Sequence, residues 1–209
     1  MPTVSASSPR DCEAECMRPA LTRQVIVDEA RRMIIAEGLG ALSLRRIAAA
    51  LEVTAPALYA YVDDKADLLR AVADQELDAL MARFDDVTEP DPVRRVAAYF
   101  RAYVDHARAE PELYPVMFLF PPSFAPGAPE GAATAAATRA FATSAQAVSD
   151  AIEAEAFREL DPLQASLVMF TAAHGTASVL LMGFGFDRAT EDELVENAIE
   201  TVIAGLRRA

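Results

Sequence analysis

Apolar side chains recur three and four residues apart along most of this chain, which is the spacing of helices that are buried on one face. Thr22 can cap a first helix that ends at Gly38, and Thr190 with Glu193 forms a capping box for the last one. No segment alternates as a half-buried strand does, so the pattern predicts an all-α fold of about nine helices. The expected elements are helices at 22–38, 44–51, 55–61, 65–84, 92–109, 132–157, 162–184 and 192–207, with a short apolar run at 116–120.

The second and third helices are short and close together. Ser43 is a suitable N-cap for the second helix and Thr54 for the third, and Pro56 falls in the first turn, where proline costs no intrahelical hydrogen bond. Only Glu52 and Val53 separate the two helices. Two short helices joined by a tight turn, after a bracing helix, are typical of a DNA-binding helix-turn-helix, although the corner of a helical bundle has the same spacing.

The run from Leu163 to Phe186 carries no charge and is long enough to cross a membrane. Polar residues interrupt it and its flanks are acidic without basic anchors, so we expect a helix of a soluble protein and no membrane contact. Such a helix, apolar on every side, is covered by its own core and by a second subunit. We therefore expect a homodimer held by the last two helices. The surplus apolar residues in them are Ala177, Leu181, Leu194, Ala198 and Val202.

The composition is that of a globular chain. Of its 209 residues 53% are hydrophobic and 24% are charged, which excludes an intrinsically disordered protein, and two cysteines exclude a disulfide-rich scaffold. Acidic residues among the first 17 positions interrupt the apolar core that a signal peptide needs. We therefore expect a cytoplasmic protein with a disordered tail at residues 1–17.

The charge is distributed unevenly along the chain. A net charge of −13 argues by itself against a nucleic-acid partner. Residues 18–62, however, carry six arginines against four acidic residues, whereas residues 63–209 carry 12 basic and 25 acidic groups. A basic N-terminal part on an acidic body is compatible with DNA binding by the helix-turn-helix alone.

The residues of the helix-turn-helix segment are more specific than their spacing. They are Gly38, Leu42-Ser43-Leu44-Arg45-Arg46-Ile47-Ala48, Leu51-Glu52-Val53-Thr54, Ala57-Leu58-Tyr59-Ala60-Tyr61-Val62, Lys65 and Leu68-Leu69. In this order, over about residues 22–70, the segment resembles the tetracycline-repressor (TetR) family of transcription regulators. The resemblance implies an N-terminal DNA-binding domain at residues 18–64 and a helical ligand-binding and dimerisation domain at 65–209. Farther along, Ala173-His174-Gly175 looks like the ligand-domain pattern of one branch of that family.

The resemblance also implies the contacts with DNA. The start of the third helix would enter the major groove, where apolar side chains suit thymine methyl groups, and Leu58 and Val62 would lock this helix onto the first. Arg45 matches a position that reaches a base, most naturally guanine; the alternative is that Arg45 and Arg46 are solvated helix charges. The implied contacts are Thr54, Ala55, Pro56, Ala57 and Arg45 with bases, Tyr59, Tyr61 and Lys65 with phosphates, and Ser43 with the DNA backbone.

One position departs from the family pattern. The turn usually has glycine before the valine, because a backbone with positive φ is easiest there, and this chain has Glu52. We expect strain of roughly 1 kcal/mol, which a folded domain tolerates. The added carboxylate either faces away from the phosphates or lowers the affinity for DNA.

Large apolar side chains gather around the proline-rich turns of the second half. They are typical of a pocket for an uncharged, apolar or aromatic molecule, although Met and Phe stripes are as typical of a solid core. We expect His174 or Thr171 to orient the ligand. We also expect ligand to displace segment 112–120 and, through the helix at 65–84, to change the spacing of the two recognition helices. The candidate ligand-binding residues are Phe100, Tyr103, Met117, Phe118, Phe120, Phe124, Phe141, Met169, Phe170 and His174.

Other chemistry finds little support in the sequence. Cys12 and Cys16 have no histidine nearby to complete a metal site, and the only histidines are His106 and His174. With neither a Gly-x-Ser-x-Gly elbow nor a glycine-rich phosphate loop, we expect no enzyme, metal or cofactor.

The sequence predicts a ligand-responsive repressor that binds an inverted-repeat operator in double-stranded DNA as a homodimer. The alternative is an all-helical enzyme or small-molecule-binding protein that does not bind DNA.

Overall fold

The computed structural model describes residues 20–120 and 135–208. Within these ranges the chain forms α-helices and two short 3-10 helices, with one isolated β-bridge between Phe157 and Arg207 and no β-strand. The predicted all-α fold is therefore confirmed. The elements are α1 (Arg23–Glu37), η1 (Leu39–Ala41), α2 (Leu44–Ala50), α3 (Ala55–Leu58), α4 (Lys65–Asp85), α5 (Pro92–Ala109), η2 (Tyr114–Phe118), α6 (Ala135–Glu153), α7 (Pro162–Leu181) and α8 (Arg188–Leu206).

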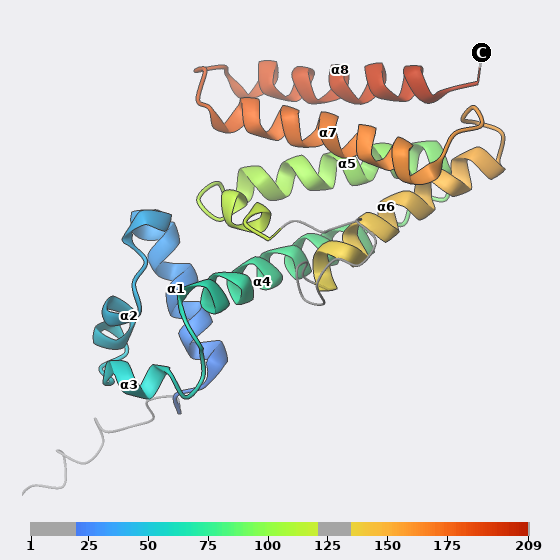
Figure 1. Cartoon of the computed structure of the whole chain (residues 1–209). Helices are drawn as coiled ribbons and strands as arrows, with labels where there is room; N and C mark the ends of the chain where they lie inside the picture. The colour runs from blue at the N-terminus through green and yellow to red at the C-terminus, as the bar shows by residue number, and fades with distance from the viewer. Residues whose placement is uncertain (1–19, 121–134, 209) are drawn as a thin grey trace, which may run out of the picture.

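The helices are arranged as a small head and an elongated body (Figure 1). The head consists of α1, α2 and α3, and the body consists of α5, α6, α7 and α8. Helix α4 starts in the head and runs on along the body, where it contacts α5, α6 and η2. Helix α7 lies between α5 and α8, so that α8 forms the outer layer (Figure 1).

The head core is formed by buried side chains of α1, α2, α3 and the first half of α4. Helix α1 begins where Thr22 accepts a hydrogen bond from the Val25 N–H (3.2 Å), and it ends at Gly38, whose φ of 80° favours glycine. Two residues from beyond α5, Leu113 and Val116, complete the head core and have no exposed surface. The centre of the head core is filled by Ile26, Ile34, Ile47, Leu58, Val62 and Leu68.

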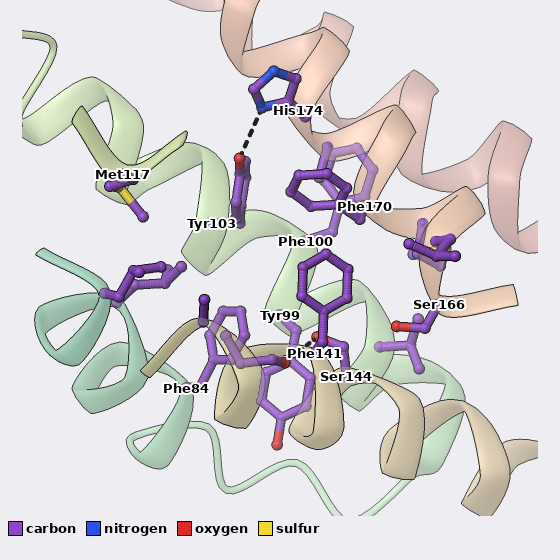
Figure 2. A pocket seen from close by; sticks show the side chains of 18 of the residues that line it. Phe84, Tyr99, Phe100, Tyr103, Met117, Phe141, Ser144, Ser166, Phe170 and His174 are labelled. Atoms are coloured by element: carbon purple, nitrogen blue, oxygen red, sulfur yellow. Dashed lines mark hydrogen bonds between the residues drawn. The ribbon is translucent and has the colours of Figure 1, made fainter. Parts of the chain in front are cut away.

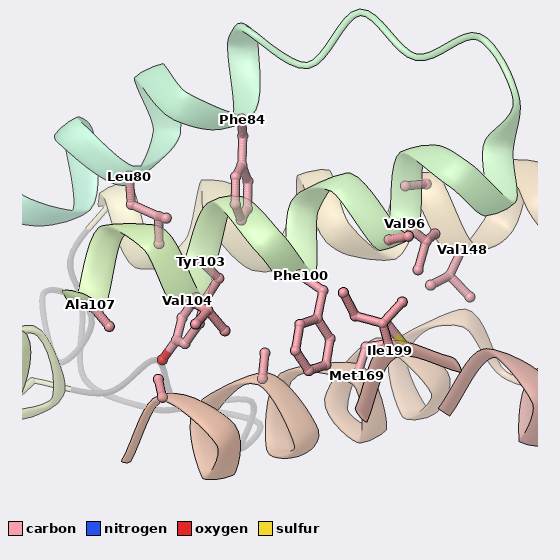
Figure 3. Packing of buried hydrophobic residues seen from close by; sticks show 14 of the residues in the cluster. Leu80, Phe84, Val96, Phe100, Tyr103, Val104, Ala107, Val148, Met169 and Ile199 are labelled. Atoms are coloured by element: carbon pink, nitrogen blue, oxygen red, sulfur yellow. The ribbon is translucent and has the colours of Figure 1, made fainter. Parts of the chain in front are cut away.

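The body core lies between the second half of α4 and the four helices of the body. Figure 3 shows Leu80 and Phe84 of α4 directed at α5, while Phe100 of α5 points to the opposite side, towards α7. Ion pairs along the rim join α5 to α8, with Arg101 lying 2.5 Å from Glu196. The body core is therefore closed on its outer side by charged side chains rather than by more apolar surface.

Several helix boundaries differ from the predicted ones, each for a local reason. The last helix begins at Arg188, because Asp187 accepts from the Thr190 N–H (2.8 Å), so Thr190 is inside the first turn and is not the cap. Helix α7 ends at Leu181, where Gly183 and Gly185 adopt positive φ. Helix α6 ends at Glu153, short of the predicted 157, and the apolar run around 116–120 is the 3-10 helix η2.

Helix α4 belongs to both cores. Leu68, Val72 and Ala73 pack in the head core, whereas Leu77 and Leu80 pack in the body core. The expected boundary between residues 64 and 65 therefore falls at the start of a helix that both parts share. The expected tail at residues 1–17 lies outside the described residues.

Candidate functional site

The predicted helix-turn-helix is formed by α2, a tight turn and α3. Ser43 caps α2 by accepting from the Arg46 N–H (3.2 Å), and the Val53 N–H closes the turn on the Ala48 carbonyl (2.9 Å). Leu58 and Val62 are buried against α1, as expected, and they fix the orientation of α3. Helix α3 is shorter than predicted, and Thr54 precedes it without a side-chain cap, although its carbonyl accepts from the Ala57 N–H (2.9 Å).

The predicted DNA contacts are exposed or half-buried side chains of the head. Ala55 and Ala57 are half-buried at the start of α3, and Ser43 is half-buried at the start of α2. Tyr59 is 57% exposed and Tyr61 is 39% exposed, so neither ring is part of the head core. The remaining predicted contacts, all exposed, are Arg45, Thr54, Pro56 and Lys65.

The two neighbouring arginines of α2 differ in what holds them. Arg46 lies against Glu37, with Nη2 2.7 Å from a carboxylate oxygen, and it also donates to the Ala41 carbonyl (3.1 Å). Arg45 is exposed and makes no ion pair with any other described residue. Arg46 therefore braces α2 against α1, whereas Arg45 is exposed to solvent, and the contact of Arg45 with a base stays a prediction.

Glu52 occupies the turn in the conformation that the sequence led us to expect. Its φ is 54°, in the left-handed region that glycine adopts most easily, and its side chain is exposed. The cost of roughly 1 kcal/mol for such a residue is small beside the burial that the head core supplies. The turn therefore keeps its shape without glycine.

A charged contact fixes the connection from α3 to α4. Arg23 donates to both carboxylate oxygens of Asp67 (2.6 and 2.9 Å) and to the Tyr61 carbonyl (2.6 Å). The hydrogen bonds from Arg23 lower the pKa of the Asp67 carboxyl, so it stays ionised. Asp64 caps α4 by accepting from the Asp67 N–H (2.7 Å). These bonds hold Tyr61 and Lys65 in place beside the start of α4.

A cavity of about 380 Å³ lies between α4, α5, α6, α7 and η2. Figure 2 shows aromatic rings around it, with Phe84 and Phe141 on one side and Phe170 on the other. None of the side chains that line it carries a charge. Eight of the predicted ligand-binding residues line this cavity: Phe100, Tyr103, Met117, Phe118, Phe141, Met169, Phe170 and His174.

At one end of the cavity His174 joins two tyrosines. The Tyr114 hydroxyl lies 2.7 Å from His174 Nδ1, the Tyr103 hydroxyl lies 3.1 Å from the same atom, and the two hydroxyls are 3.2 Å apart. Burial lowers the pKa of His174, so its imidazole is neutral and Nδ1 accepts from the phenols. Burial also raises the pKa of Tyr103 and of Tyr114, which therefore stay protonated. The two hydroxyls and Nδ1 are therefore hydrogen-bonded to one another.

Two predictions about this region need correction. Phe120 does not line the cavity, because its ring packs against the head core with the Arg70 guanidinium 4.4 Å from its centre. Thr171 cannot orient a ligand, because it is exposed and its hydroxyl donates to the Leu167 carbonyl (2.8 Å). Phe124 lies outside the described residues, as do Cys12 and Cys16.

Several residues that line the cavity were not predicted from the sequence, although some of them are spaced four residues from a predicted one on the same helix. Ser166, Phe170 and His174 are four residues apart on α7, so they share one helix face. Tyr99 stands in the same relation to Tyr103 on α5. The other lining residues that were not predicted are Leu77, Leu80, Phe84, Val96, Ala137, Ala140, Ser144, Val148, Leu167 and Ala173.

The short helix η2 has one face in each part of the molecule. Leu113, just before it, and Val116 are buried in the head core. Met117 and Phe118 line the cavity, and Phe118 contacts His174 edge-on, with the ring centres 4.6 Å apart. The same few residues of chain are therefore in contact with the head and with the cavity.

A buried polar cluster lies at the same junction of head and body. Arg31 of α1 lies 2.5 Å from Glu76 of α4 and 3.0 Å from Glu110, which ends α5. His106 of α5 is buried beside Glu76, with Nε2 3.9 Å from the carboxylate. Burial, with help from Arg83, lowers the pKa of His106 to about 4, so the ring is neutral at pH 7.

Comparisons with known proteins agree with this division into head and body. Residues 26–72 match the family model for bacterial regulatory proteins of the tetR family. Residues 96–202 match the model for the tetracyclin repressor-like C-terminal domain, which spans more than half of the chain. The chain belongs to the tetracycline-repressor (TetR) family. Members of this family are DNA-binding regulators of transcription and not enzymes, so the alternative of an enzyme without a DNA partner is wrong.

Solved structures include close matches to the TetR chain described here. A protein of unknown function from Rhodococcus sp. RHA1 has 27% sequence identity and a TM-score of 0.78, over 93% of this chain and all of that one. RolR, solved in complex with resorcinol, has 18% identity and a TM-score of 0.66, over 88% of this chain and 86% of RolR. A TetR/AcrR-family regulator from Thermobifida fusca YX-ER1 has 21% identity and a TM-score of 0.64, over 89% of this chain and 98% of that one. No curated protein sequence matches the chain.

Helix α7 is the one described helix that is long and apolar enough to span a membrane by length and composition alone. In this TetR structure it packs against α5, α6 and α8. Among residues 20–120 and 135–208, no group of three or more His, Cys, Asp or Glu side chains is placed to hold a metal ion. The described site is therefore an apolar cavity beside a DNA-binding head.

Proposed function

We propose that this TetR-family regulator is a cytoplasmic repressor that binds an inverted-repeat operator as a homodimer and responds to an uncharged, apolar or aromatic effector. The observation that carries the proposal is the position of η2, between the cavity and the head core. A molecule that displaces Met117 or Phe118 also moves Leu113 and Val116, which are part of the same short segment. Occupation of the cavity is thereby coupled to the placement of the head.

The uncharged lining of the cavity supports the proposed class of effector. A buried charge without a partner is costly, and no lining side chain could neutralise one. The ring of His174 is neutral and already bonded to Tyr114, so it does not attract an anion. A volume of about 380 Å³ is at the lower end of the range for small-molecule sites. A molecule with one or two rings fits this description.

The exposed surface of the head supports the proposed contacts with DNA. The start of α3, from Thr54 to Ala57, is assigned to base edges in the major groove, and Arg45 is assigned to a guanine. The side chains of Tyr59, Tyr61 and Lys65 are assigned to phosphates, and Ser43 to the DNA backbone.

The outer surface of α7 and α8 supports a homodimer. Val168 is 53% exposed on α7, and Met182 continues the same apolar side beyond the end of the helix. Gly175 and Gly205 face open space within one chain, so packing inside the subunit does not require glycine at either place. Glycine in a helix costs up to about 1 kcal/mol, which the close approach of a partner helix would explain. The prediction that Ala177 serves this interface is wrong, because it is buried in the body core.

The proposed function is tested with DNA from upstream of the protein's own gene. Fluorescence anisotropy should show saturable binding to one fragment that contains an inverted repeat, with half-sites about one helical turn apart. Binding should be lost when either half-site is scrambled. An effector found by thermal-shift screening of uncharged aromatic compounds should change that affinity by about fivefold or more. A protein that binds effector but discriminates no DNA sequence would contradict the proposal.

A further inference from the structure

One polar group in the wall of the cavity has no hydrogen-bond partner among the described residues. It is the hydroxyl of Ser166, on the first turns of α7, and only 1% of this residue is exposed. Figure 2 shows the hydroxyl directed into the cavity, on the side where Phe141 and Ser144 of α6 lie. A buried hydroxyl without a partner is unfavourable, and buried polar groups in native proteins are paired in the great majority of cases.

Other hydroxyls on helices of the body show what Ser166 does not do. Ser144 donates to the Ala140 carbonyl (3.0 Å), and Thr176 donates to the Ala172 carbonyl (2.8 Å), four residues back in each case. The corresponding carbonyl for Ser166 is that of Pro162, four residues back, but the Ser166 hydroxyl does not donate to it. Its hydroxyl is therefore free to bond to a molecule in the cavity.

The two ends of the cavity differ in what they can offer a ligand. At one end the hydroxyls of Tyr103 and Tyr114 are bonded to His174 Nδ1 and lie within hydrogen-bond distance of each other, so these three atoms are already partnered. Ser166 and His174 are eight residues apart on one face of α7, which separates them by about 12 Å along the helix. The polar group of a ligand that spans this length therefore has its unmet partner at the Ser166 end.

From this arrangement we infer that the cavity selects a neutral, elongated aromatic molecule with a hydroxyl or carbonyl group at one end, and that Ser166 is the residue that recognises this group. The inference rests on the proposed ligand-binding role of the cavity, and it adds the chemistry and orientation of the ligand. The aromatic part lies among the rings of Phe100, Phe141 and Phe170, and the polar group points away from His174.

A matched pair of probes tests this inference. Biphenyl and 4-phenylphenol have the same two rings and differ by one terminal hydroxyl. Titrated into the full-length protein, 4-phenylphenol should bind about tenfold more tightly than biphenyl, because only it reaches the Ser166 hydroxyl. In the Ser166→Ala variant the two probes should bind within about twofold of each other. Ser149→Ala is the control, and it should keep the tenfold preference, because Ser149 does not line the cavity and its hydroxyl bonds to Glu153 on its own helix.

Three results would overturn the inference: equal binding of both probes to the wild type, no binding of either, or an unchanged preference in Ser166→Ala. The melting temperature without ligand gives a second readout. Ser166→Ala should keep or raise it, because the variant removes an unpaired buried hydroxyl, and a clear decrease would show that the hydroxyl is bonded within the protein. A DNA titration at saturating 4-phenylphenol addresses the proposed function separately. Unchanged operator affinity would contradict the proposed coupling of ligand binding to DNA binding. It would not contradict recognition of the ligand's polar group by Ser166.

Discussion

Arg45 and Arg46 are neighbours on α2, but only Arg46 is held by other residues of the head, through Glu37 and the Ala41 carbonyl. Adjacent positions on a helix point in different directions, and the sequence alone does not say which of the two faces DNA. The same uncertainty applies to any pair of charged neighbours on an exposed helix. A contact of one of them with a fixed partner, such as Glu37, shows only which of the two is held by the protein.

Replacing Arg45 by alanine should weaken operator binding and relax the preference at one base pair in each half-site. The expected loss is about 1–3 kcal/mol on the preferred base and much less on the other three bases. Binding to a set of operators that vary at single positions measures this.

Two variants serve as comparisons for Arg45→Ala. Arg46→Ala should keep the sequence preference, because it removes an exposed ion pair worth at most about 1 kcal/mol. Lys65→Ala should weaken binding to all sequences alike and reduce the salt dependence. If the Arg45→Ala protein keeps the sequence preference of the wild type, then Arg45 contacts only a phosphate or is a surface charge.

His106 provides a prediction about pH. Its pKa is about 4 in the folded protein because of burial and of the neighbouring Arg83 and Arg31, which outweigh Glu110, and about 6.5 in an unfolded chain. Below pH 6.5 the unfolded chain therefore binds a proton that the folded protein does not, and the free energy of unfolding should fall by about 3 kcal/mol between pH 7 and 4. One carboxylate oxygen of Glu76 is paired with Arg31, and the other lies 3.9 Å from His106 Nε2, beyond hydrogen-bond distance, so Glu76 does not reverse this order.

Urea unfolding at several pH values measures this effect, with His106→Leu as the reference. The variant lacks the titrating ring, so the difference in unfolding free energy between the two proteins should change with pH, whereas acidic groups elsewhere affect both equally. Parallel pH profiles for the two proteins would show that His106 is protonated in the folded state as well.

At the scale of elements, the helices that the sequence predicted best are those with a clear cap. Thr22 and Ser43 accept the N-terminal hydrogen bond expected of them. The last helix was misplaced, because Asp187 and Thr190 are both good caps and the choice between them is made by geometry. The cavity was predicted only in part, because helical spacing shows which residues share a face but not which face of another helix lies opposite.

The dual position of η2 could not be read from the sequence, and it yields a prediction. Val116 is buried in the head core and does not line the cavity, so Val116→Ala should leave effector affinity nearly unchanged. The effect of effector on operator affinity should shrink severalfold, since the contact that transmits the movement is reduced. Isothermal titration with effector, followed by DNA binding with and without it, measures both.

Leu119→Ala is the matched control for this prediction. Leu119 follows directly after η2, is 43% exposed and does not line the cavity. Its loss should change neither affinity nor coupling. Full coupling in Val116→Ala would show that the signal reaches the head through α4 alone.

At the scale of the whole molecule, the exposed face of α7 explains why this helix is apolar all round. Its inner side packs in the body core, and its outer side carries Val168, Gly175 and other uncharged residues that solvent alone would not favour. A partner subunit on this face would place two heads on one side of the dimer. An operator with two-fold symmetry then follows from the symmetry of the protein.

Val168→Glu should convert the dimer to a monomer, because it places a charge in the centre of the proposed interface. Sedimentation velocity at micromolar protein measures the change, and operator affinity should fall with it. Leu119→Glu puts the same charge on an exposed apolar position outside α7 and α8 and should leave the dimer intact. A wild type that sediments as a monomer would exclude the dimer outright.

The presence of Leu113 and Val116 in the head core also limits how this protein can be divided. A fragment that stops at the end of α4 lacks both side chains and leaves apolar surface of α1 and α4 open to water. The DNA-reading part is thus not an autonomous unit, even though it comes first in the chain. A chimaera that joins this head to the effector domain of another regulator will fold well only if the new domain supplies two apolar side chains at the positions of Leu113 and Val116.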